Sequence, residues 1–136
     1  MPDSKRILII DDDYAIVGAL KDALEFYGFE VSTALNGFDG LAAMKVGPRP
    51  GLIFLDIHMP AMDGHEFINI LRSDPEYRDI PVAVMSAGAD LKEFKNADCA
   101  LKKPFDLDEV LAIATSNTGL TSLELSVKLN TTKILV

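Results

Sequence analysis

Acidic side chains directly follow short apolar runs in this sequence. Asp11, Asp12 and Asp13 come after the run ILII, and Asp56 ends the run LIFLD. One aspartate would be enough to cap a following helix. Adjacent carboxylates repel one another unless a cation lies among them, and oxygen ligands of this kind suit Mg²⁺. The clustering therefore indicates a cation site in addition to a helix cap.

Two further residues with useful chemistry follow later apolar runs. Ser86 comes after VAVM, and Lys103 lies in the motif KKPF. A carboxylate such as Asp56 can act as a nucleophile and become an aspartyl phosphate. Phosphoryl transfer then depends mainly on in-line positioning and charge neutralisation, which a divalent cation and a lysine ammonium would supply. A serine hydroxyl could donate a hydrogen bond to a phosphoryl oxygen. These residue types together favour phosphoryl transfer onto Asp56.

The apolar runs themselves predict strands. Three runs are apolar without alternation, which is typical of strands covered on both faces of a parallel sheet. They are Ile7–Ile10, Leu52–Leu55 and Val82–Met85. A more polar run, Glu30–Ala34, is expected near an edge of that sheet, and Asp98–Lys102 is expected to form a weak fifth strand. The carboxyl ends of parallel strands lie at one edge of the sheet. We therefore expect the acidic, serine and lysine side chains to meet there.

Between the strands, apolar residues recur at helical spacing. Glycine or proline ends three of these segments, and Asp106 with Glu109 has the spacing of a capping box at the start of the last. The alternation of strands and helices predicts an α/β domain with a doubly wound five-stranded parallel sheet. The helical positions are Ile16, Leu20 and Leu24; Phe38, Leu41 and Ala42; Phe67, Ile68 and Leu71; and Leu107, Val110, Leu111 and Ala114.

Composition limits the classes of function. The chain has 136 residues, a net charge of −8 and one cysteine, Cys99. So acidic a surface argues against direct nucleic-acid binding, which relies on Lys and Arg against phosphates. A single cysteine excludes an internal disulfide and a cysteine-based zinc site. No apolar run approaches the roughly 18 residues of a membrane span, and the N-terminus does not read as a signal peptide, so a cytoplasmic protein is expected.

Residues 117–136 have a different pattern. Leu123, Leu125, Val127 and Leu129 alternate with polar residues, which predicts a half-buried strand. Two fates stay open for it. It could pair with a sheet edge of its own molecule or of a neighbour, which would make a homodimer, or it could be a non-native or disordered extension. The expected division is a domain over residues 1–116 and an extension over residues 117–136.

Four motifs in order resemble the receiver domains of two-component response regulators. They are ILIIDDD, LIFLDIHMPAMDG, LRSDPEYRDIPVAVMSA and KPF, and the likeness covers residues 5 to about 116. The resemblance implies a flavodoxin-like fold with the strand order 2-1-3-4-5. It also implies a phosphorylation switch, in which added charge on one residue biases a two-state element of the domain.

The resemblance assigns a role to each candidate residue. Asp56 would accept a phosphoryl group from a sensor histidine kinase or phosphotransfer protein, while Ser86 and Lys103 would contact that group. The bond before Pro104 is expected to be cis. The domain would catalyse only its own phosphorylation and dephosphorylation, and would signal by phosphorylation-dependent binding to a downstream protein. The implied Mg²⁺ ligands are Asp11, Asp12, Asp56 and the backbone carbonyl of His58.

Two features depart from the family pattern. The family usually has Tyr or Phe three residues before the lysine, where this sequence has Ala100. The span from Ser86 to Lys103 looks about five residues shorter than in most receivers, so the helix between the last two strands should be short, displaced or frayed. Both features favour an alternative function, in which a degenerate receiver binds other proteins without needing phosphorylation.

Two other assignments fit the sequence less well. Asp11 and Asp13 are spaced as in the nucleophile motif of haloacid-dehalogenase-like phosphatases, but Ala15 stands where those enzymes have Thr or Val. That assignment would also leave the Asp56 loop unexplained. A flavin-binding role suits the fold, but no phosphate loop rich in Gly, Ser or Thr follows the first strand.

Overall fold

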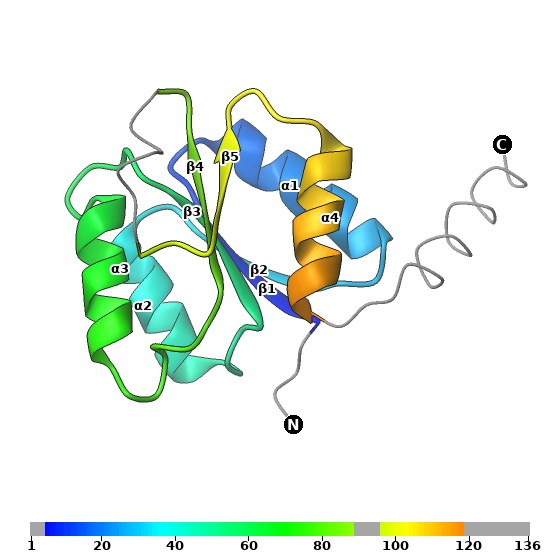
Figure 1. Cartoon of the computed structure of the whole chain (residues 1–136). Coiled ribbons are helices and arrows are strands. Elements are labelled where there is room, and N and C mark those ends of the chain that lie inside the picture. Colours follow the sequence, from blue (N-terminus) through cyan, green and yellow to red (C-terminus); the bar gives the residue numbers. More distant parts are fainter. Residues whose placement is uncertain (1–4, 89–95, 119–136) are drawn as a thin grey trace, which may run out of the picture.

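A parallel β-sheet forms the centre of the molecule (Figure 1). The structure is a computed structural model and describes residues 5–88 and 96–118. The strands lie in the order β2-β1-β3-β4-β5, and every neighbouring pair is parallel. The predicted strands and the implied strand order are therefore confirmed. The strands are β1 (Arg6–Ile10), β2 (Glu30–Ala34), β3 (Leu52–Asp56), β4 (Val82–Ser86) and β5 (Cys99–Lys102).

Helices cover both faces of the sheet within the described part of the chain. The helices α1 (Tyr14–Phe26) and α4 (Leu107–Thr118) lie against one face, and α2 (Gly37–Val46) and α3 (Gly64–Ser73) lie against the other (Figure 1). The predicted doubly wound α/β fold is confirmed. None of these helices combines the length and apolar composition needed to cross a membrane.

The burial of the strands explains their sequence patterns. In β1, Leu8 and Ile10 belong to the core beside α2 and α3, while Ile7 and Ile9 belong to the core beside α1 and α4. Every residue of β3 and β4 is buried, so both faces of these strands require apolar side chains up to the polar residues Asp56 and Ser86 at their carboxyl ends. The edge strand β2 is mostly exposed, which fits its more polar composition.

Two predictions concern residues outside the described ranges: the short helix between β4 and β5, and the C-terminal strand around residues 123–129. Helix α4 is described up to Thr118, which lies past the boundary expected at residue 116, and the Thr118 side chain is buried. The helical part of the domain thus reaches at least Thr118. The division into a domain and an extension stays a prediction.

Aspartate side chains fix the starts of two helices near the carboxyl ends of the strands. Asp13 accepts a hydrogen bond from the backbone N–H of Ala15 at 2.9 Å, and Asp63 accepts one from the backbone N–H of Glu66 at 2.9 Å. Each bond satisfies a donor that has no partner within the helix. Asp13 is therefore the cap of α1, and its role differs from that of the preceding two aspartates.

Gly64, at the start of α3, allows this helix to approach the loop that follows β3. A methyl group on Gly64 would lie 2.7 Å from the Cα atom of Ile57, which is backbone and cannot easily move. The Gly64 N–H also donates to the carbonyl of Ile57 at 3.1 Å. This close contact fixes the position of the residue that directly follows Asp56.

The substitution Gly64→Ala is expected to lower the free energy of unfolding by about 1–3 kcal/mol, because the added methyl group overpacks this contact. Gly18→Ala is the matched control. A methyl group there meets nothing within 4 Å, and alanine favours a helix interior over glycine by about 1 kcal/mol. Urea unfolding of both variants measures the difference. Equal stability of Gly64→Ala and the parent would contradict the role given to this contact.

Candidate functional site

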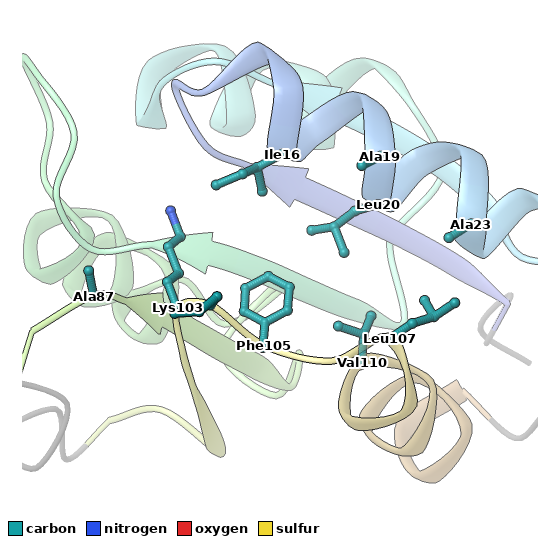
Figure 2. A pocket seen from close by; sticks show the side chains of 10 residues that line it. Ile16, Ala19, Leu20, Ala23, Ala87, Lys103, Phe105, Leu107 and Val110 are labelled. Carbon is teal, nitrogen blue, oxygen red and sulfur yellow. The ribbon is translucent and has the colours of Figure 1, made fainter.

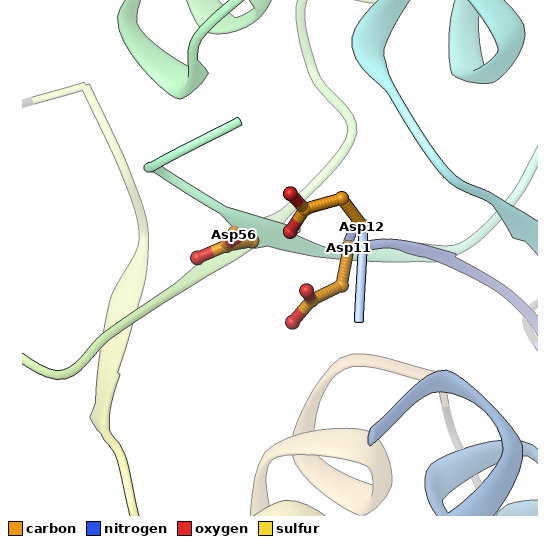
Figure 3. A group of neighbouring side chains, drawn as sticks. All are labelled: Asp11, Asp12 and Asp56. Atoms are coloured by element: carbon orange, nitrogen blue, oxygen red, sulfur yellow. The ribbon is translucent and has the colours of Figure 1, made fainter. Parts of the chain in front are cut away.

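The carboxyl ends of β1 and β3 bring three carboxylates together (Figure 3). Asp11 and Asp12 directly follow β1, and Asp56 is the last residue of the neighbouring strand β3. One oxygen atom from each of the three side chains lies within 4.8 Å of the others. The structure thus places together the acidic residues that the sequence pattern predicted to meet.

Two of the three carboxylates are buried. Asp11 is 0 % exposed and Asp56 is 5 % exposed, whereas Asp12 is exposed. A buried charge is unfavourable unless it is paired or hydrogen-bonded. Asp11 accepts a hydrogen bond from the backbone N–H of Asp13 at 3.0 Å, which satisfies part of this need. The remaining negative charge requires a cation.

Lys103 brings positive charge to these carboxylates from the end of β5. Its Nζ donates to Asp11 Oδ2 at 2.8 Å and lies 3.5 Å from Asp56 Oδ1. Burial alone would lower the pKa of the Lys103 ammonium. The hydrogen bond and negative charge of Asp11, together with the charge of Asp56, outweigh that effect and raise the pKa above its ordinary value. Lys103 is therefore held in its charged form.

The pKa of Asp56 is raised above its ordinary value of 3.8. Burial is the largest cause, and the negative charge of Asp11 adds to it. The charge of Lys103 and hydrogen bonds from Lys103 and from the backbone N–H of His58 act in the opposite direction without cancelling the effect. The protein thus leaves the charge of Asp56 incompletely compensated, and a bound cation would stabilise the ionised form.

Ser86 ends β4, the strand next to β3, and its side chain is 1 % exposed. Its Oγ accepts a hydrogen bond from the backbone N–H of Gly88 at 3.0 Å, and its carbonyl accepts one from the backbone N–H of Lys103 at 2.8 Å. The peptide bond between Lys103 and Pro104 is cis, as the resemblance implies. These contacts join the ends of β4 and β5 beside the carboxylates.

Some contacts of the site come from the backbone and have no signature in residue type. The His58 N–H on Asp56 and the Gly88 N–H on Ser86 are of this kind. The His58 side chain is exposed, so the described link between this residue and the site runs through its backbone. Whether its carbonyl also binds a metal stays a prediction.

Comparison with known proteins identifies the class. The sequence matches the family model for the response regulator receiver domain over residues 7–115. A similar curated protein is the DNA-binding dual master transcriptional regulator RpaA of Synechocystis, which is 40 % identical over 112 residues. That alignment covers 79 % of this chain and 46 % of RpaA. The chain spans about half the length of the curated relatives it matches.

Solved structures agree with this assignment. The chemotaxis protein CheY4 of Vibrio cholerae matches with a TM-score of 0.76 and 26 % identity, over 82 % of this chain and 97 % of CheY4. The response regulator TrrA of Thermotoga maritima, solved in complex with Mg(2+)-BeF, matches with a TM-score of 0.73 and 29 % identity, over 85 % and 98 %. The fold and the comparisons define a signalling domain of a two-component system. The chain belongs to the response regulator receiver domain family.

Asp56→Asn is expected to stabilise the protein at neutral pH in a buffer that contains EDTA. The pKa of Asp56 in the folded protein lies above its ordinary value of 3.8. Stability therefore falls as the pH rises from 3.8 through the folded pKa, because the unfolded chain releases this proton first. Asparagine has nearly the same shape and no charge. The increase in the free energy of unfolding of Asp56→Asn over the parent should be absent below pH 3.8. It should reach its full size above the pKa of Asp56 in the folded protein.

Thermal unfolding of the parent and the variant across this pH range measures the gain. Asp22→Asn is the control, because Asp22 is exposed on α1 and its substitution should change stability by no more than about 0.5 kcal/mol. A gain for Asp56→Asn of the same size at acidic and neutral pH would contradict the raised pKa.

Proposed function

We propose that this chain is a phosphorylation switch in which Asp56 accepts a phosphoryl group from the phosphohistidine of a sensor histidine kinase or phosphotransfer protein. The observation that carries the proposal is the group of Asp11, Asp12 and Asp56 with Lys103 at the carboxyl edge of the sheet. Family membership supports the class of function. The residue roles are part of the proposal.

The three carboxylates suit a hard divalent cation such as Mg²⁺. Their oxygens are close enough to share one ion, and the charge of Asp56 is incompletely compensated by Lys103. The resemblance adds the backbone carbonyl of His58 as a further oxygen ligand. When bound, the cation would supply positive charge to the phosphoryl oxygens and retain several waters. The Mg(2+)-BeF complex of TrrA supports this assignment.

In the proposed transfer, an oxygen of Asp56 attacks the phosphorus atom of the donor. An O–P bond forms, the P–N bond to the donor imidazole breaks, and the leaving nitrogen keeps the electron pair and takes up a proton. Lys103, which already lies near Asp56, would turn its ammonium toward a phosphoryl oxygen. The Ser86 hydroxyl would donate to another phosphoryl oxygen, which draws the end of β4 toward Asp56.

The proposed output is binding to a downstream protein. The net charge of −8 does not favour phosphate contacts. We therefore propose that residues 1–136 do not bind nucleic acid directly. We also propose, as a separate expectation, that the domain works in the cytoplasm without associating with a membrane. It would catalyse no reaction beyond its own phosphorylation and dephosphorylation.

A second candidate function is binding of partner proteins without phosphorylation. Ala100 favours it, since this exposed residue of β5 stands where the family usually has an aromatic side chain. The intact acidic group and Lys103 count against it, because a domain without phosphoryl chemistry would not need to keep two carboxylates buried.

Acetyl phosphate with Mg²⁺ is expected to add about 80 Da, the mass of one phosphoryl group, to the intact protein. The gain should disappear in Asp56→Asn and in the presence of EDTA, because the first removes the nucleophile and the second removes the cation. Intact mass spectrometry measures it, with Asp39→Asn, an exposed aspartate at the start of α2, as the matched control.

Labelling of Asp56→Asn at the parent's rate would contradict the proposed acceptor. No labelling of the parent, under conditions that label CheY4 of Vibrio cholerae, would favour the phosphorylation-independent function.

Mg²⁺ is expected to raise the midpoint of thermal unfolding of the parent, because an ion that binds only the folded state stabilises it by mass action. The increase should be largely lost in Asp11→Asn, since Asp11 is a buried member of the group. The control is Asp13→Asn, which keeps an N-cap residue. An equal Mg²⁺-dependent increase in Asp11→Asn and the parent would contradict the assigned ligand set.

A further inference from the structure

A groove of about 580 Å³ lies between α1 and the start of α4 (Figure 2). Ala19 and Ala23 lie one helical turn apart on α1, and these small side chains leave space that larger ones would fill. Phe105 and Leu107 line the facing wall, and Lys103 lies at the end nearest the carboxylates. The groove is therefore separate from the acidic group but adjoins it through one residue.

The groove leaves apolar surface uncovered. Leu107 is 40 % exposed, Ala19 is exposed, and Ile16, Ala23 and Phe105 are partly exposed. Apart from Lys103, the side chains that line the groove are apolar. A concave apolar surface of this size is typical of a binding site and fits an apolar occupant better than a charged one.

The chain itself carries a segment of suitable chemistry. Residues 119–136, which follow Thr118 of α4, include eight apolar residues (Leu120, Leu123, Leu125, Val127, Leu129, Ile134, Leu135 and Val136). Fully extended, these 18 residues can span about 60 Å. Helix α4 has 12 residues and a length of about 18 Å. The segment is therefore long enough to return along α4 and reach the groove.

Charge also favours this occupant. Exposed acidic residues are next in sequence to residues that line the groove: Asp22 precedes Ala23 on α1, and Asp108 and Glu109 follow Leu107 on α4. Residues 119–136 contain three charged side chains, and two of them are lysines, Lys128 and Lys133. Opposite charges on two surfaces favour their association and help to orient the bound segment.

We propose that residues 119–136 cover the groove between α1 and α4 of their own molecule. The alternating residues Leu123, Leu125, Val127 and Leu129 provide the apolar contact, and the polar residues between them face water. Attachment at Thr118 makes the contact intramolecular, with an effective concentration in the millimolar range for a short linker. The proposal does not depend on phosphoryl transfer to Asp56.

The test uses a nitroxide spin label at Asp22→Cys in the chain of residues 1–136, which also carries Cys99→Ser. The amide NMR signals of residues 123–129 are expected to lose intensity, because the segment lies close to the label on α1. The control places the label at Ile70→Cys, an exposed position on α3 at the opposite face of the sheet, where the same signals should keep their intensity. Undiminished signals with the Asp22→Cys label would overturn the proposal.

Two further measurements test which side chains of residues 119–136 make the contact and whether the segment comes from the same molecule or from a second copy. Leu125→Glu should restore the lost intensity, whereas Ser126→Glu, with the same added charge on the polar side, should not. Equal effects of the two variants would overturn the proposed contact face. A mixture of spin-labelled copies with isotope-labelled, unmodified copies reports contact between molecules. Loss of intensity in that mixture would assign the groove to a second copy and overturn the intramolecular contact, whereas unchanged signals there support it.

Discussion

The structure depends on the balance between two buried carboxylates and one lysine. Asp11 and Asp56 are held out of water by neighbouring strands, and Lys103 reaches both from β5. In the sheet, β3 and β4 lie between β1 and β5. The ion pairs therefore form only when β1, β3, β4 and β5 are paired in the sheet. The site is a property of the whole sheet, which explains why residues so distant in sequence act as one group.

The sequence allowed much of this to be predicted, because the physical signals are local. Apolar runs without alternation identified β1, β3 and β4, since both faces of these strands are buried. The parallel arrangement then placed Asp56 and Lys103 at one edge. Contacts set by tertiary packing had no such signal. Arg72 at the end of α3 donates to the carbonyl of Ile80 at 2.8 Å and to Asp98 at 2.9 Å, and no pattern in the sequence links these three residues.

Of the two departures from the family pattern, the structure describes the residue at position 100 but not the helix expected between β4 and β5. Ala100 is exposed on β5. Because alanine has no aromatic ring, no rotation of a ring at this position can transmit the state of Asp56. Ser86 and Lys103 are instead joined through the backbone at the ends of β4 and β5. A displacement of either strand end would be passed directly to the other. The helix expected to be short between these strands falls on residues outside the described ranges, so this departure and its effect on signalling stay predictions.

The contacts of Arg72 also bear on how this domain tolerates changes in chain length. Arg72 donates to the carbonyl of Asn96 at 3.0 Å as well as to Asp98, and Asp98 accepts a hydrogen bond from the N–H of Val82 at 2.8 Å. These contacts anchor the chain that enters β5 to α3 and β4. These contacts would hold the register of β5 if residues were removed or inserted between Gly88 and Asn96. Lys103 would then stay within reach of Asp11 and Asp56 when the length of this connection changes.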